Sequence, residues 1–378
     1  MARELPAVRA AGLGSVPERM WDAAAARLET DVPGLTEGQL FVRLAQMVAM
    51  LHDDETLVEF PPGPVFALDA QWVGGGLYLL AVLPADRALL GARLLAVDGH
   101  PVGQVLARAG TLIDAEDPQL RDNIETGALD DGALLHWLGI TPSATAAVLT
   151  VQTAAGNRQT VRITATGRGF ITWPRFVADQ QPGLARAPLA RYEERATQPY
   201  WMQILPAQHA VYLKYNQCLS GSGFHQLAAR ALALLAAHRD YRLIVDLRDN
   251  GGGDTEPFQP LISGIKASPQ LMERGRIIGL VNQFTASSAT WDAQSLKQAG
   301  AVLIGQPPAD PVDEWGNEQT FRLPRSGIVM QYTSATVNPG GTLLGTPDVV
   351  VEPTLAQILA GDDPVLAAAL SYQPTGRD

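Results

Sequence analysis

Cysteine is almost absent from this chain of 378 residues, which contains only Cys218. An intramolecular disulfide is therefore excluded, and no Cys/His cluster is available for structural zinc. No run of 18 or more apolar residues occurs, so no membrane-spanning segment is predicted. The first 20 residues also lack the apolar stretch of a signal peptide. We expect a soluble chain without a metal or cofactor, and a lone cysteine fits either redox compartment.

Basic residues are also in deficit. Lys and Arg number 28 against 39 Asp and Glu, which gives a formal net charge of −11. Because nucleic-acid binding requires clustered cations, we expect no nucleic-acid partner. Hydrophobic residues make up 46% of the chain and charged residues 18%, so a sizeable core can form. At roughly 150 residues per domain, the length predicts two or three domains.

Residues 1–62 are expected to form an N-terminal helical segment. Ser15 and Glu18 have the spacing of a capping box, and Thr36 with Gln39 repeats it. Apolar residues then recur at helical spacing over 40–51, which predicts a helix with one buried face.

Residues 63–168 show mostly β patterns, and 169–207 contain several prolines with little periodicity, as in a linker. From residue 208 to 378, strands alternate with helices, which predicts an α/β core with a parallel sheet. Ligand sites in such sheets lie at the carboxyl ends of strands. The expected strands are 76–82, 89–99, 147–153, 159–164, 210–215, 243–247, 276–281 and 301–305, and the expected helices are 102–112, 225–238 and 288–298.

Three consecutive glycines follow the strand 243–247, within the segment Asp246–Asp254. Their N–H groups suit an anion, either a phosphate or an oxyanion. A phosphate loop requires Gly-Lys-Ser/Thr and a dinucleotide site requires G-x-G-x-x-G, and both are missing. A flexible loop is the alternative for the glycines alone. Asp246 and Arg248 are expected to pair and brace this loop.

A second polar segment, Phe284–Trp291, follows the strand 276–281. A serine on a strand-to-helix turn exposes its hydroxyl, and the N–H group of the next residue can stabilise an oxyanion. The simpler interpretation is an ordinary helix N-cap at Thr285 or Ser287, and this is favoured for the segment taken alone.

The two segments together resemble the tail-specific, or C-terminal processing, serine peptidases, which are related to the tricorn core and the interphotoreceptor retinoid-binding protein. The similarity rests on the order D-L-R-x-N-x-G-G, T-A-S-S-A and L-I-G-x-P, and extends over roughly residues 40–370. It implies a mixed α/β fold in which a crotonase-like βαβ core carries a PDZ-like β module, here residues 63–168.

By this resemblance, the nucleophile is Ser287 and the oxyanion or substrate-binding residues are Ser288, Asn250, Gly251 and Gly252. Attack of a serine hydroxyl on an amide creates a tetrahedral oxyanion, which two fixed N–H donors stabilise. A peptide or protein substrate is implied, held as an added strand by the PDZ-like module. An extracytoplasmic location is compatible with the family, although the sequence does not assign one.

The sequence departs from the family at the general base. One branch uses a lysine about 25 residues after the serine, but that position is Val312, and residues 305–319 contain no lysine. Another branch uses the histidine of D-x-H-T, and Glu55 stands at that position. A glutamate, with an ordinary pKa near 4.3, is a weak base toward a hydroxyl unless burial raises its pKa. His52 is the nearest imidazole.

Two functions remain open from the sequence. The chain is either a serine-type peptidase, with Glu55 or His52 giving weak assistance, or a non-catalytic homologue that binds a peptide or apolar ligand in the same cleft. A phosphate-binding α/β domain is a third, weaker interpretation. The acidic triplet 53–55 suits calcium, but a solvated helix end is the favoured interpretation.

Overall fold

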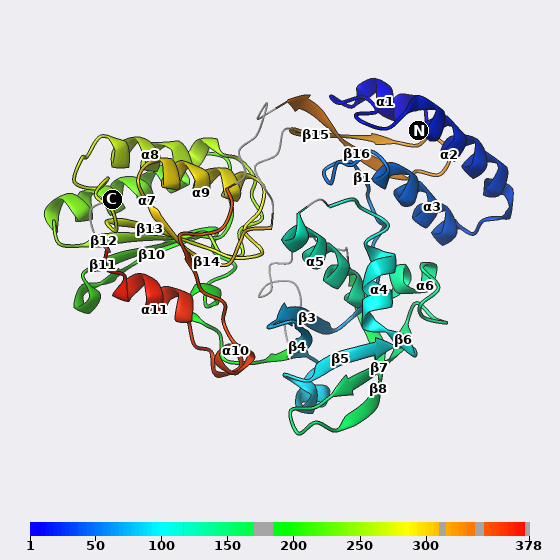
Figure 1. The fold of residues 1–378 in the computed structure, drawn as a ribbon, viewed down its shortest axis with the longest axis horizontal. Helices are drawn as coiled ribbons and strands as arrows, with labels where there is room; N and C mark the ends of the chain where they lie inside the picture. Colours follow the sequence, from blue (N-terminus) through cyan, green and yellow to red (C-terminus); the bar gives the residue numbers. More distant parts are fainter. Residues whose placement is uncertain (116, 170–183, 310–314, 337–343, 375–378) are drawn as a thin grey trace. The chain divides into compact units, whose positions relative to one another are not determined.

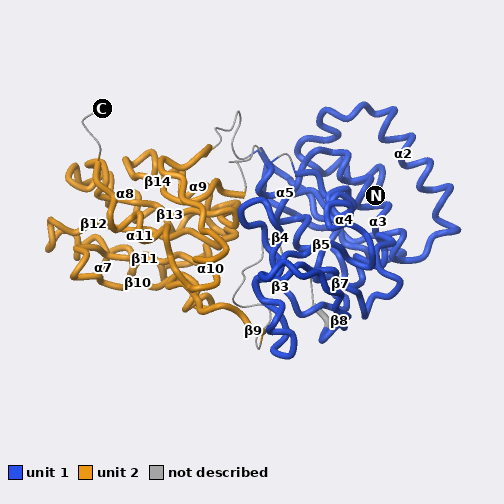
Figure 2. The backbone as a smooth tube through the Cα atoms, turned by 60° about the horizontal axis from the view of Figure 1, so that its bottom comes forward, with its two compact units in different colours: residues 1–173, 313–341 blue, residues 174–312, 342–378 orange. Residues whose placement is uncertain are grey.

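The computed structural model describes residues 1–115, 117–169, 184–309, 315–336 and 344–374 (Figure 1). The chain forms two compact units, shown in Figure 2. Unit 1 contains residues 1–173 and 313–341, and unit 2 contains residues 174–312 and 342–378. Helices and strands occur in both, so the predicted mixed α/β class is confirmed.

Unit 1 begins with the helices α1 (Glu4–Val8), α2 (Glu18–Asp31) and α3 (Glu37–Ala49). The capping box at Thr36 is confirmed, because its Oγ1 accepts from Gln39 N at 3.3 Å and Gln39 Oε1 accepts from Thr36 N at 2.9 Å. The capping box at Ser15 is wrong: Pro17 is the N-cap of α2 and offers no side-chain acceptor. The apolar face of α3 is buried, as its periodicity predicts.

The β module of unit 1 is an antiparallel sheet with the strand order β2-β8-β7-β5-β4-β3, and β6 pairs with β5. The predicted hairpin is confirmed as β7 and β8, and the strand 76–82 as β4. The strands are β2 (Gly63–Phe66), β3 (Leu68–Val73), β4 (Gly76–Val82), β5 (Arg93–Val97), β6 (His100–Pro101), β7 (Ala146–Gln152) and β8 (Arg158–Gly169), and the helices are α4 (Val102–Ala109), α5 (Pro118–Gly127) and α6 (Gly132–Trp137).

The chain returns to unit 1 late in the sequence. The hairpin of β15 (Trp315–Arg322) and β16 (Val329–Thr336) pairs through β16 with β1 (Leu57–Val58). The sequence-based boundaries assign all of 208–378 to the core, whereas residues 313–341 belong to unit 1. Local patterns give no sign of this return, because the paired strands are far apart in the chain.

A buried carboxylate fixes this return. Asp53 Oδ2 accepts from Arg9 Nε at 2.7 Å, from Thr56 Oγ1 at 2.7 Å and from Thr333 Oγ1 at 2.9 Å. These three donors come from the N-terminal region, the segment before β1, and β16. Asp53 is only 7% exposed, so the expectation of a solvated helix end is wrong for this residue.

Unit 2 contains a sheet with the strand order β10-β11-β12-β13-β14-β17. The neighbours from β11 to β17 pair in parallel, as predicted, and β10 pairs antiparallel with β11. The strand β10 lies within the expected linker and was not predicted. The bounds are β10 (Tyr200–Leu205), β11 (Ala210–Tyr215), β12 (Arg242–Asp246), β13 (Ile277–Val281), β14 (Val302–Gly305) and β17 (Val349–Val350), with β9 (Ala185–Arg186) preceding them.

Helices cover both faces of this sheet (Figure 1). Alternate residues of β11 pack into different clusters: Val211, Leu213 and Tyr215 join α7, α8 and α9, whereas Tyr212 joins α11. The period of two therefore places Lys214 on the α11 face. These helices are α7 (Gly223–Ala237), α8 (Gln259–Lys266), α9 (Ser288–Gln298) and α11 (Pro364–Ser371), and α10 (Leu355–Ala360) precedes α11.

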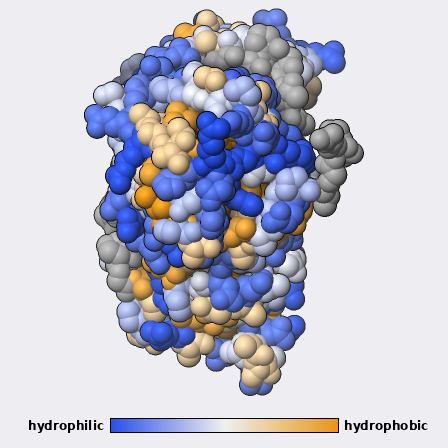
Figure 3. All heavy atoms as spheres, turned by 90° about the vertical axis from the view of Figure 1, so that its left-hand side faces the viewer, coloured by the Kyte–Doolittle hydropathy of each residue, from blue (hydrophilic) through white to orange (hydrophobic). Residues whose placement is uncertain are grey.

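The molecular face in Figure 3 is mostly hydrophilic, and its apolar residues form small separate patches. Among the helices that the structure describes, none has the length and apolar character to cross a bilayer.

We predict that Asp53→Ala lowers the free energy of unfolding by about 3 kcal/mol, because it leaves the buried Arg9 guanidinium without its partner. The matched control is Asp31→Ala. Asp31 also pairs with an arginine at 2.7 Å, but both side chains are more than a third exposed. The control should lose less than about 1 kcal/mol. Urea denaturation of both variants tests this, and equal losses would contradict the role of Asp53.

Candidate active site

The glycine loop begins with a side-chain turn at the end of β12. Asn250 Oδ1 accepts a hydrogen bond of 2.9 Å from Gly252 N, and Asn250 Nδ2 donates to the Tyr215 carbonyl at 2.9 Å. An oxygen that accepts from the N–H group two residues later forms an Asx-turn. Asn250 is fully buried, so its amide serves to shape the loop.

Two glycines of the loop allow backbone approaches that no other residue permits. Gly252 has φ +97°, and a Cβ there would lie 2.7 Å from Ser287 Cβ and 2.8 Å from Ser288 N. Gly253 has φ +133°, and a Cβ there would lie 2.2 Å from the Cys218 carbonyl oxygen. The loop therefore lies directly against both the serine turn and the segment at Cys218.

Ser287 occupies a strained position between β13 and α9, with φ +51° and ψ −131°. Such a conformation costs on the order of 1–3 kcal/mol in a residue with a side chain, and strain of this kind gathers at functional sites. Hydrogen bonds hold the turn: Ala286 N donates to the Asn250 carbonyl at 2.9 Å, and Thr285 Oγ1 donates to the Leu247 carbonyl at 3.0 Å.

The simple capping role expected for this segment is not observed. Ser287 is the N-cap residue of α9, but its side chain makes no capping hydrogen bond. Thr285 instead bonds to the Leu247 carbonyl. The strained turn is therefore maintained by contacts with the glycine loop rather than by a cap.

The backbone donors near Ser287 differ in their partners. Gly252 N–H donates to Asn250, whereas the N–H groups of Gly251, Gly253 and Ser288 form no hydrogen bond within the part of the chain that the structure describes. Ser288 Oγ donates to the Gly253 carbonyl at 2.6 Å. The structure thus brings Ser287 together with Ser288 and the glycine run, and the Ser288 hydroxyl is engaged with the loop.

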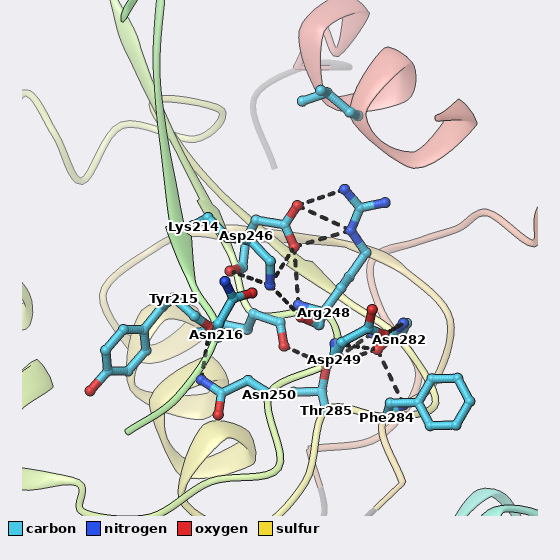
Figure 4. A network of polar contacts seen from close by, with 12 residues as sticks. Lys214, Tyr215, Asn216, Asp246, Arg248, Asp249, Asn250, Asn282, Phe284 and Thr285 are labelled. Atoms are coloured by element: carbon cyan, nitrogen blue, oxygen red, sulfur yellow. Dashed lines mark hydrogen bonds and ion pairs between the residues drawn. The ribbon is translucent and has the colours of Figure 1, made fainter. Parts of the chain in front are cut away.

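A buried ion network fixes the start of the loop (Figure 4). Arg248 Nη2 lies 2.6 Å from Asp246 Oδ2, and Arg248 Nη1 lies 2.8 Å from Oδ1 of Asp363, which is at the N-terminus of α11. The expected pairing of Asp246 with Arg248 is confirmed. The Arg248 guanidinium also lies 3.9 Å from the centre of the Tyr192 ring, and Lys214 Nζ donates to the Arg248 carbonyl.

Burial and charge act in opposite directions within this network. Burial by itself raises the pKa of Asp246, but the charges of Arg248 and Lys214 outweigh it and leave this pKa below its usual value. Burial lowers the pKa of Lys214, and the charge of Asp246 opposes that shift. Both effects follow from the absence of solvent around all three side chains.

A second pair of acids lies beside the network. Asp249 has φ +57°, its N donates to Asn282 Oδ1 at 3.0 Å, and Asn282 Nδ2 donates to its carboxylate at 2.7 Å. Burial raises the pKa of Asp249. Burial and then the charge of Asp249 raise the pKa of Glu193 to about 7.

The candidate bases belong to unit 1, whereas Ser287 belongs to unit 2. Glu55 Oε2 accepts from Gln331 Nε2 at 3.3 Å, and the same amide donates to the Glu55 carbonyl at 3.0 Å. His52 is about half exposed, and its Nδ1 lies 2.7 Å from Asp114 Oδ2. Val312, at the family's lysine position, lies outside the described residues.

Comparison with solved structures identifies the fold. Mature CPAF matches with a TM-score of 0.64 and 14% sequence identity, over 93% of this chain and 90% of that chain. A serine-to-alanine mutant of CPAF matches with a TM-score of 0.65 and 12% identity, over 96% and 94%. The chain has the CPAF fold. Because the sequence identities are this low, the matches establish the fold alone. For the fold, they confirm the resemblance that the motifs indicate.

A more distant match is the photosystem II D1 C-terminal processing protease, with a TM-score of 0.44 and 16% identity over 96% of both chains. No protein-family model and no curated protein matches the sequence. The CPAF fold is therefore recognised through the backbone and a few short motifs.

Two residues that shape this site, Asn282 and Asp363, are not among the predicted site residues. Asn282 holds the serine turn together with Thr285, which was predicted only as a possible helix N-cap, and Asp363 holds the entrance of the loop. Asn282 N donates to Thr285 Oγ1 at 3.0 Å, and this spacing of three residues after a strand is the one local signal that was available. Asp363 acts across a long chain separation, which no local pattern reveals.

We predict that Gly252→Ala destabilises the chain by about 3 kcal/mol, because it combines a left-handed backbone with a clash against Ser287 and Ser288. Gly99→Ala is the matched control, since Gly99 has φ +80° but open space around its Cβ position. The control should cost about 1 kcal/mol. Chemical denaturation measures both, and equal costs would show that the glycine loop is not packed against the serine turn.

We also predict a pH effect from Glu193. Its folded-state pKa of about 7 exceeds its usual value of 4.5, so the folded chain retains a proton that the unfolded chain has released. The stabilisation of the folded state by this proton is complete below pH 4.5 and is lost as the pH rises toward 7. Glu193→Gln should remove about 2 kcal/mol of that decline, allowing for partial exposure. Denaturation of both proteins between pH 4 and 8 measures it, and parallel curves would refute it.

Proposed function

We propose that this protein is a serine-type hydrolase that cleaves peptides or protein C-termini through an acyl-enzyme on Ser287. The observation that carries the proposal is the strained Ser287 backbone at the start of α9, packed against Gly252. The CPAF fold supports the proposal, since it agrees with the family resemblance that the motifs around Ser287 imply.

The proposed chemistry follows from the positions of the backbone donors. Ser287 Oγ attacks the substrate carbonyl, its proton passes to a base, and the oxyanion forms beside the N–H group of Ser288. Gly251 and Gly253 supply the further N–H groups in this proposal. Gly252 N–H, which donates to Asn250, becomes a donor to the oxyanion only if that bond opens. As the intermediate collapses, the C–N bond breaks and the base returns the proton to the leaving amine; water then hydrolyses the ester on Ser287.

We assign the base position to Glu55, with His52 as the nearest imidazole. The Gln331 amide holds the Glu55 carboxylate and the Glu55 carbonyl together, so this side chain has a defined orientation. A carboxylate is a poor acceptor for a serine proton at its ordinary pKa. We therefore expect slow acylation compared with a histidine base, which typically contributes about 10²–10⁴-fold.

The second candidate function is that of a non-catalytic homologue that binds a peptide or an apolar ligand. The observation that favours it is Glu55 itself, which stands where a histidine is required and whose carboxylate accepts from a neutral amide. In this case Ser287 would contribute to ligand contact only. The β module, which has the strand arrangement given above, would take up a peptide as an added strand.

A fluorophosphonate probe tests the nucleophile directly, because it phosphonylates an activated serine. We expect labelling of the wild type, and complete loss of labelling in Ser287→Ala. Ser288→Ala is the matched control, since it removes the neighbouring hydroxyl but keeps its N–H group, and it should retain labelling at a rate within about tenfold of the wild type. An unlabelled wild type, or equal labelling of Ser287→Ala, refutes the proposal.

Substitution at Glu55 tests the base. Glu55→Gln keeps the shape and the capacity to contact Gln331, but removes the carboxylate, and should slow labelling by at least about tenfold. Glu55→His restores the D-x-H-T pattern and should raise the rate above the wild type. If Glu55→Gln labels as fast as the wild type, then Glu55 is not the base, even when Ser287 is the nucleophile.

A further inference from the structure

Beneath the glycine loop lies a buried carboxylic acid that the proposed reaction does not use. Asp292 is on α9, one helical turn after Ser288, and is 0% exposed. Its Oδ2 lies 3.5 Å from the Cys218 thiol, and its Oδ1 has no hydrogen-bond partner among the described residues. A helical side chain leans toward the N-terminus, so Asp292 lies below the first turn of α9.

The surroundings of Asp292 favour the protonated form of its carboxyl group. Burial raises its pKa well above the usual value, and the nearby charge of Asp254 adds to the shift. The charge state matters for the proposed chemistry, because an ionised carboxylate below the first turn of α9 would repel an oxyanion beside Ser288 N–H. A protonated acid can fill this position without that penalty.

Cys218 connects Asp292 to the glycine loop. Its thiol lies 3.6 Å from Asn250 Oδ1, the atom that accepts from Gly252 N–H. Its backbone also borders the loop, since Cys218 N donates to the Gly252 carbonyl at 3.1 Å and Asp254 N donates to the Cys218 carbonyl at 2.8 Å. Asp292, Cys218, Asn250 and Gly252 thus form one continuous set of contacts, which we call the subloop cluster.

The thiol is suited to contact and not to reaction. Burial raises the pKa of Cys218, the neighbouring Asp292 carboxyl group adds to the shift, and the Cys218 side chain is 2% exposed. A buried thiol held in its protonated form is a poor nucleophile. Its place in the subloop cluster is therefore to fill the space between Asp292 and Asn250 and to donate weakly to them.

We infer that Asp292 is a positioning residue of the oxyanion site: through Cys218 and Asn250 it fixes the glycine loop against Ser287 and the first turn of α9. This inference rests on the proposed function for its catalytic consequence. The structural part of the inference, that Asp292 immobilises the loop, holds independently of the proposed function. Truncation of Asp292 leaves a cavity next to the Asx-turn, so the loop gains freedom where the donors must be fixed to within a fraction of an ångström.

The first measurement is the rate of fluorophosphonate labelling, separated into the maximal rate and the probe concentration that gives half of it. Asp292→Ala should lower the maximal labelling rate about tenfold to a hundredfold, which is no more than the loss of one oxyanion donor causes. The probe concentration that gives half of the maximal rate should stay within about threefold of the wild-type value. Asp292→Asn, which matches the neutral acid in shape, should restore the rate to within about threefold of the wild type.

Leu235→Ala is the control for lost core packing. It truncates a buried side chain near the end of α7, which belongs to the same hydrophobic core as Cys218 but lies outside the subloop cluster. It should lower stability as Asp292→Ala does, yet leave the labelling rate unchanged where both proteins are folded. Cys218→Ala should slow labelling like Asp292→Ala, and the double variant should be no slower than either, because contacting residues are not additive.

The second measurement does not depend on activity. Hydrogen exchange of the peptide covering residues 248–256 should accelerate in Asp292→Ala and Cys218→Ala, since the Gly252 and Asp254 amides lose protection, but not in Asp292→Asn or Leu235→Ala. An unlabelled wild type with this exchange pattern refutes the proposed function and retains the role of Asp292. Unchanged exchange and unchanged labelling in Asp292→Ala overturn the inference.

Discussion

The buried ion pair between Arg248 and Asp246 is the interaction on which the rest of the site depends. Removing one member of such a pair typically costs 3–5 kcal/mol, because the other charge stays buried without compensation. Around this pair, Asp363 attaches α11 to the end of β12, and Lys214 holds the Arg248 carbonyl. The glycine loop begins directly after Arg248, so its starting point is fixed by charges on three separate elements.

The glycine loop and the serine turn stabilise each other. The absence of a side chain at Gly252 allows the approach to Ser287, and the Asn250 carbonyl in turn accepts from Ala286. The strained backbone at Ser287 persists because these contacts over-determine it. The two segments are not two independent sites, and a defect in either should disturb the other.

The candidate nucleophile and the candidate base belong to different compact units. Ser287 is held by strand ends and α9 in unit 2, whereas Glu55 is held by Gln331, which the late return of the chain brings into unit 1. The Asp53 contacts secure that return. The candidate base position thus depends on a hairpin distant in sequence, while the proposed oxyanion donors belong to unit 2.

The sequence by itself determined the parallel sheet of unit 2, the helix after Thr36, the pairing of Asp246 with Arg248 and the two loops that carry Ser287 and the glycines. These features follow from short-range periodicity and from motifs within one segment. Only the tertiary structure decided the burial of Asp53, the return of 313–341 to unit 1 and the contacts of Asp363 and Asp292. Each of these joins residues far apart in the chain or depends on solvent exclusion, and neither leaves a local pattern.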